Sequence, residues 1–165
     1  LGVQRNTTIT NHRQQFNALK LNISQQQEKI DAAKQQRIET EDRIKDLERT
    51  LDPQQTYVAN LETGIQGLET DIQRLKNKSN MSSLELKALM IRKDDLQNQL
   101  TQARPHFEKT QHELQTLKEA LTQSEPEIKS LENELNVMEL KTQQVQLAID
   151  KENLLMQGDF LLATP

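Results

Sequence analysis

Apolar residues recur every seven positions along nearly the whole chain. With Phe16 taken as position a, the a positions from 16 to 156 are apolar at 17 of 21 places, where composition alone predicts about seven. The d positions from 19 to 159 are apolar at 13 of 21 places, and most other positions carry Gln, Glu, Lys, Asp, Thr or Asn. A narrow apolar stripe of this period is typical of a coiled coil, because one helix alone cannot bury it.

We call the a and d positions the seam. The seam predicts an all-α fold whose core is a row of aliphatic side chains. The predicted core residues are Ile23, Ile30, Ile44, Leu47, Leu61, Ile65, Leu68, Ile72, Leu75, Leu86, Leu89, Leu96, Leu100, Leu114, Leu117, Leu121, Ile128, Leu131 and Leu135.

The pattern is interrupted near the middle of the chain. Residues 77–83 read NKSNMSS, and both seam positions inside this segment are serines. Ser82 and Glu85 have the spacing of a capping box, which indicates that a new helix begins there. The predicted turn and cap residues are Ser79, Asn80, Met81, Ser82 and Glu85. The predicted segments are a lead-in at 1–10, a first arm at 11–76, a turn or tip at 77–83, a second arm at 84–157 and a C-terminal segment at 158–165.

Charges beside the seam favour a hairpin over a parallel dimer. If the chain folds at the turn, facing seam residues have numbers that add to 161, and six flanking charge pairs, such as Lys34 with Glu125 and Lys118 with Glu41, all attract. A parallel homodimer has three attractive and three repulsive pairs. We therefore predict a long two-stranded antiparallel coiled-coil hairpin. The alternative is a long parallel dimeric coiled coil.

Three prolines fall inside the predicted arms. A proline in a helix interior removes a hydrogen bond, costs about 3 kcal/mol and kinks the helix. Asp52 and Ser124 stand before Pro53 and Pro126 where the N-cap of a restarted helix would be. We predict kinks near 52–53, 104–105 and 125–126, and interpret Pro53, Pro105 and Pro126 either as hinges or as local distortions.

The last stretch of the chain breaks the amphipathic pattern. Residues 154–163 are apolar on all sides, and Gly158 predicts the end of the helix. An exposed apolar patch of this kind indicates a docking segment, for which the candidate residues are Phe160, Leu161 and Leu162. The predicted partners are other protein subunits, which would bind the tip and this segment.

Composition excludes several classes of protein. The chain has 165 residues, of which 33% are apolar and 2% aromatic, too few for a compact globular core. The net charge is −4 and lysines and arginines do not cluster, which argues against direct nucleic-acid binding. No apolar run approaches the roughly 18 residues of a membrane span. The chain begins at Leu1 without a signal-like segment, so we interpret it as a fragment or a processed product. The sequence does not determine the compartment, although the lack of a visible signal segment favours an intracellular one.

Candidate chemistry is equally sparse. The spacing of His12, His106 and His112 does not suit a metal site on one helix face, and these residues are predicted to be solvated. The chain lacks cysteine, a Gly-rich phosphate loop, a nucleophile elbow and an HExxH sequence. We therefore expect no enzyme, cofactor, metal or small-molecule ligand.

The predicted function is mechanical. We interpret the chain as a non-enzymatic structural spacer or projecting coiled-coil arm of a larger assembly, which mediates protein–protein organisation. One alternative is a parallel homodimeric rod or tether of a cytoskeletal or filament-type protein. Two others are the arm of an SMC-like chromosome-organising ATPase and the hairpin of a bacterial secretion adaptor.

Overall fold

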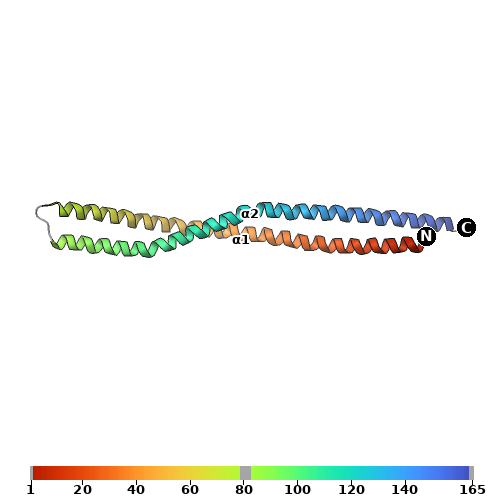
Figure 1. Ribbon diagram of the computed structural model, residues 1–165, viewed down its shortest axis with the longest axis horizontal. Coiled ribbons are helices and arrows are strands. Elements are labelled where there is room, and N and C mark those ends of the chain that lie inside the picture. The colour runs from red at the N-terminus through yellow and green to blue at the C-terminus, as the bar shows by residue number, and fades with distance from the viewer. Residues whose placement is uncertain (1, 79–82, 164–165) are drawn as a thin grey trace. The chain divides into compact units, whose positions relative to one another are not determined.

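The computed structural model describes residues 2–78 and 83–163, apart from the side chains of residues 160, 162 and 163. It contains two helices, α1 (Gly2–Lys76) and α2 (Ser83–Ala163), and no strand among these residues (Figure 1). The two helices pack against each other within one chain, so the predicted all-α hairpin is confirmed. The parallel dimer, which needs a single unbroken helix, is wrong as the fold.

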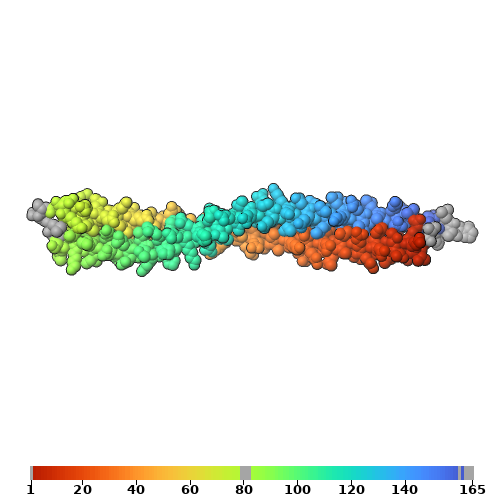
Figure 2. Space-filling view, viewed as in Figure 1, coloured from red at the N-terminus to blue at the C-terminus, as the bar shows by residue number. Residues whose placement is uncertain are grey.

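The chain divides into two compact units, and each pairs a segment of α1 with a segment of α2. The terminal unit consists of Leu1–Ile38 and Gln123–Pro165, and the central unit is Glu39–Thr122. In the terminal unit, the first segment of α1, red in Figure 2, lies along the last segment of α2, in blue.

The seam lies between the two helices in both units. From Ile9 onward, every described residue at an a or d position whose burial is known is buried or half-buried, whereas most residues at the other five positions are exposed. The buried members of the predicted core are Ile30, Ile44, Leu47, Leu61, Ile65, Leu68, Ile72, Leu75, Leu114 and Ile128. The half-buried members are Ile23, Leu86, Leu89, Leu96, Leu100, Leu117, Leu121, Leu131 and Leu135.

A cluster in the central unit shows the register of the helices. Ile44, Leu47 and Leu114 are buried together, and Leu117 is among the half-buried residues packed against them. In the predicted register Ile44 faces Leu117 and Leu47 faces Leu114, since both pairs of numbers add to 161. The contacts of this cluster therefore agree with the register predicted from the seam and its flanking charges.

A buried glutamine links the helices of the terminal unit. Gln26, at a d position, is only 3% exposed. Its Nε2 donates to the backbone oxygen of Leu131 at 3.0 Å and to Oε2 of Glu134 at 3.1 Å. The predicted register places Gln26 opposite residue 135, next to both acceptors. The buried amide therefore keeps its donors satisfied, as a polar group inside a seam must.

Ion pairs beside the seam use partners farther along the chain than predicted. Lys118 lies 3.7 Å from Glu48 and Lys34 lies 3.5 Å from Glu132, whereas the sequence predicted carboxylates seven residues earlier in each case. The reason is geometric, because the Cα–Cβ bonds of each helix tilt toward its own N-terminus. For these two lysines the tilt favours partners whose numbers add to 166, five more than facing seam residues, over the predicted partners, whose numbers add to 159.

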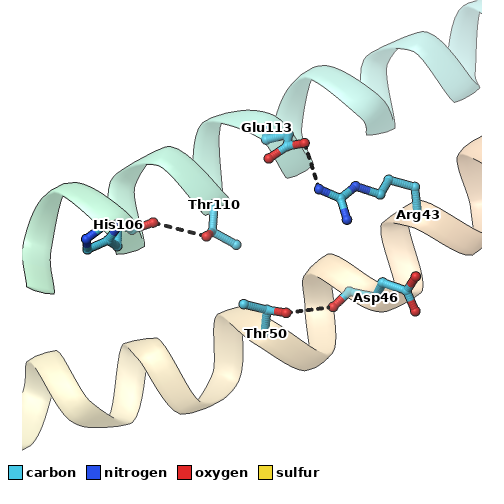
Figure 3. A network of polar contacts seen from close by, with 6 residues as sticks. All are labelled: Arg43, Asp46, Thr50, His106, Thr110 and Glu113. Atoms are coloured by element: carbon cyan, nitrogen blue, oxygen red, sulfur yellow. Dashed lines mark hydrogen bonds and ion pairs between the residues drawn. The ribbon is translucent and has the colours of Figure 1, made fainter.

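Figure 3 shows how polar groups are arranged in the central unit. Arg43 reaches across the seam to Glu113, with Nη2 and Oε1 3.1 Å apart. Thr110, buried at a d position, donates instead to the carbonyl oxygen of His106 in its own helix at 3.0 Å. A threonine can therefore occupy the seam without a partner on the other helix.

Both helices are longer than predicted at the ends of the chain. α1 begins at Gly2, so the predicted lead-in at 1–10 is helical, and Ile9 is a further a position that is only 3% exposed. α2 continues through Gly158 to Ala163, and Gly158 lacks the positive φ of a helix cap. The predicted helix end at Gly158 is therefore wrong. A glycine costs about 1 kcal/mol relative to Ala, which tertiary contacts of the terminal unit can offset.

The helices also run through all three prolines. Pro53 lies inside α1, and Pro105 and Pro126 lie inside α2, so the predicted restarts at Asp52 and Ser124 do not occur. All three rings are exposed, on the side away from the seam. The carbonyl group that each proline leaves without a helical donor therefore faces water, which limits the cost. The proposed hinges stay a prediction.

The predicted turn residues Ser79, Asn80, Met81 and Ser82 lie outside the described residues. Before them, the amide of Asn77 donates to the carbonyl oxygen of Gln73 at 3.1 Å and extends the last turn of α1. After them, Glu85 lies in the first turn of α2, where a carboxylate favours the positive end of the helix dipole.

Candidate protein-interaction sites

One group of exposed apolar side chains lies at the start of α2 in the central unit. Leu84 is 81% exposed, Ile91 60% and Met90 47%. Leu84 and Ile91 occupy heptad position f, on the far side of the helix from the seam, so they contribute nothing to the hairpin. Lys87 and Arg92, also exposed, stand beside them on the same helix. We call these five residues the tip group. Its chemistry suits a protein surface that offers apolar and acidic side chains.

A second group runs along the outer face of α2 in the terminal unit. Four consecutive f positions carry leucine, with exposed fractions of 59%, 68%, 68% and 72% in chain order. We call them the leucine stripe, and they are Leu140, Leu147, Leu154 and Leu161. Of the predicted docking residues, Leu161 belongs to this stripe, while the side chains of Phe160 and Leu162 lie outside the described part of the structure.

The sequence prediction missed the stripe as a surface. It placed the docking segment after residue 153 and treated it as apolar on all sides, so Leu140 and Leu147 were left out. The signal was present in the heptad frame itself, because leucine occupies every f position from 140 to 161. A search confined to a and d positions could not find it.

An arginine joins the first segment of α1 to the last segment of α2. Arg5 Nε lies 2.5 Å from Oδ2 of Asp159, and Arg5 Nη1 lies 3.9 Å from Oε2 of Glu152. The N–H of Nε and the facing Oδ2 do not form an aligned hydrogen bond, so the contact is ionic. Because these side chains are only 23–30% exposed, the charges are less screened than those of a fully exposed pair.

The histidines differ in their surroundings. His106 and His112 are exposed, but His12 occupies a d position and is half-buried, and its Nδ1 has no hydrogen-bond partner among the described residues. The expectation that His12 is a solvated surface residue is therefore wrong. Residues 2–78 and 83–163 contain no group of three His, Asp or Glu side chains placed to hold a metal ion. In the same residues, neither helix has a stretch apolar and long enough to cross a membrane.

Comparison with known proteins adds no family to this description. The chain matches no protein-family model, no characterised protein and no solved structure at a significant level. The surfaces described above are therefore the basis for a functional proposal.

Proposed function

We propose that this chain is a non-enzymatic structural arm, an antiparallel two-stranded coiled coil that organises other proteins in a larger assembly. The observation that carries the proposal is the division of apolar residues between two faces. The seam is covered by the partner helix in both units, while the tip group and the leucine stripe point outward. The exposed side chains of the tip group and the leucine stripe are available to other molecules.

A coiled coil of two strands suits a mechanical role better than catalysis. A catalytic site needs a concave and partly dry pocket that positions its groups and shifts their pKa values. Most charged side chains of these two helices lie beside the seam or on the outer face, where water surrounds them. The same architecture gives a regular rise of about 1.5 Å for each residue of an arm.

The central unit contains a natural place for such an arm to bend. Pro53 and Pro105 lie at nearly the same level of the register, since their numbers add to 158. Each proline removes one backbone hydrogen bond from its own helix, so the backbone hydrogen bonding of both helices is weakened at the same level. We propose that this level bends more easily than the rest of the central unit.

A pair of cysteines tests the hairpin directly. The chain has no cysteine, so Ile65→Cys with Leu96→Cys introduces a single pair of thiols. These residues face each other in the register, and we expect a disulfide within one chain under dilute oxidising conditions. Ile65→Cys with Leu89→Cys, displaced by one heptad, is the matched control and should stay reduced. Cross-linked dimers from the first pair would contradict the hairpin.

Deleting matched heptads tests the role of an arm. Removal of residues 58–64 together with 97–103 takes out segments that face each other, so the remaining layers keep their partners. We expect this variant to fold, with its longest dimension in small-angle X-ray scattering shorter by roughly 10 Å. Deleting 58–64 alone would place Ile44 opposite Thr110 and should destabilise the fold. Equal destabilisation by both deletions would refute the proposed arm.

A further inference from the structure

The leucine stripe differs from the outer face of α1. Among the f positions of α1, only Leu21 is apolar, whereas four successive f positions of α2 carry leucine. Exposed apolar side chains in a regular row, unlike those scattered singly, indicate an interaction site. A repeat of seven residues is the period at which one helix keeps a single face against another helix. The stripe therefore fits a helix that runs along it.

We propose that this helix is α2 of a second copy of the chain, running parallel to the first. In a parallel pair related by a two-fold axis along the helices, each leucine of the stripe meets its own counterpart. The b positions of one helix then face the c positions of its partner, at nearly the same height. Asp150 occupies position b and Lys151 position c, so Asp150 of each copy faces Lys151 of the other.

The same geometry pairs the uncharged residues between the leucines. Gln143 at b faces Gln144 at c, and both amides are exposed in the monomer and free to pair with each other. Asp150 accepts one hydrogen bond from Gln146 at 2.9 Å, which leaves lone pairs for the lysine of the partner. Every polar position that flanks the stripe between Leu140 and Leu154 thus meets a compatible group.

An antiparallel arrangement fails on charge. In antiparallel helices, b positions face b positions and c positions face c positions. The register that pairs all four leucines then brings Asp150 against Asp150 and Lys151 against Lys151 of the second copy. Like charges placed in this way repel, so the charge pattern beside the stripe selects the parallel dimer.

The size of the stripe sets the expected affinity. Stable complexes bury roughly 800 Å² on each partner, and a single row of leucines offers less. We therefore expect a dissociation constant in the micromolar range. The seam within each hairpin is not part of this contact, so the dimer does not depend on the proposed arm, and either proposal can fail without the other.

Sedimentation equilibrium of the intact chain from about 1 µM to about 1 mM tests the association. We expect the mass to rise from one copy to two across this range. The double variant Leu147→Gln with Leu154→Gln should raise the dissociation constant at least about tenfold. Leu21→Gln, the same change at an exposed f position of α1, should leave it unchanged. A monomer throughout the range, or equal weakening by Leu21→Gln, would overturn the proposal.

Circular dichroism of the same variants excludes a trivial cause. Glutamine is a good helix former, and the substituted side chains point away from the seam. The helical signal at 222 nm and the thermal midpoint of the dilute monomer should therefore match those of the unmodified chain. Loss of association together with an unchanged helical signal supports the stripe as the interface.

Charge reversal tests the orientation. In the parallel dimer, Lys151→Asp places two carboxylates together on each side of the stripe and should weaken association about two- to tenfold. Adding Asp150→Lys restores opposite charges and should recover the original dissociation constant. In an antiparallel dimer neither change alters the number of like-charge pairs. Unchanged association of the Lys151→Asp variant would therefore exclude the parallel arrangement.

Discussion

The substitution Ile30→Ala measures how much one layer of the seam stabilises the hairpin. Ile30 is 1% exposed and is the most completely buried large side chain among the described residues. Truncation of a buried isoleucine to alanine costs about 2–5 kcal/mol through lost burial and the cavity left behind. The value here belongs at the lower end, because the seam of a two-helix structure is one layer deep and water can reach the cavity.

Helix propensity reduces this cost slightly. Alanine is favoured over isoleucine in a helix by about 0.4 kcal/mol, so we expect a net loss of about 2 kcal/mol in the free energy of unfolding. The matched control is Leu21→Ala, in the same helix and unit, where the side chain is 59% exposed. That change should stay within about 0.5 kcal/mol of the unmodified chain.

Urea denaturation followed by circular dichroism at 222 nm provides the assay. The midpoint should fall for Ile30→Ala and the slope with denaturant should stay constant, since the surface exposed on unfolding hardly changes. A second probe of tertiary structure must give the same transition for the free energies to be comparable. If Ile30→Ala and Leu21→Ala shift the midpoint equally, the seam does not hold the hairpin together and the packing argument fails.

Three further substitutions test other parts of the structure. Gln26→Leu replaces a buried amide with an apolar side chain, and we expect the urea midpoint to rise by the equivalent of about 1 kcal/mol. A fall in the midpoint would show that the hydrogen bonds of the Gln26 amide stabilise the hairpin more than burial of a leucine does. Arg43 and Glu113 are about half exposed, so a double-mutant cycle should give a coupling energy below about 1 kcal/mol that disappears in about 1 M salt. A coupling energy that persists in salt would contradict a screened surface pair. A Cβ at Gly67 meets no neighbouring atom, so Gly67→Ala should raise the free energy of unfolding in urea denaturation by about 0.5–1 kcal/mol. A Cβ at Gly64 would lie 3.2 Å from a methyl of Leu96, so Gly64→Ala should gain less in the same assay, and an equal gain would contradict this close contact.

The register could be predicted from the sequence because few choices existed. A seven-residue repeat allows the two helices to slide only in steps of one heptad, and the flanking charges distinguish those steps. The cluster around Ile44 and Leu114 agrees with the step at which facing numbers add to 161. The individual ion pairs were less predictable. Lys118 pairs with Glu48, and Lys34 pairs with Glu132, because the side chains lean toward the N-terminus of their own helix. Pairing residues by their numbers alone does not take this direction into account.

The ends of the helices depended on contacts that no local pattern reveals. Gly158 and the prolines are local signals for a break, and each is worth a few kcal/mol at most. The helices nevertheless continue through these positions, because seam contacts on both sides of each position stabilise the helical conformation. At the end of α2, Asp159 directly follows Gly158 and contacts Arg5, which stands more than 150 positions earlier in the chain. A contact between positions so distant cannot be inferred from the residues around Gly158.

The two faces of α2 differ in what they demand of the sequence. On the inner face, polar residues such as Thr110 and Thr142 are tolerated, because each hydroxyl donates to a carbonyl oxygen of its own helix at 3.0 Å and 2.8 Å. On the outer face, apolar residues are not needed, because the same hairpin would form with polar side chains at these positions. The proposed dimer accounts for leucine at four successive f positions. A second copy would cover this face, and the charges of Asp150 and Lys151 match those that a parallel copy would present.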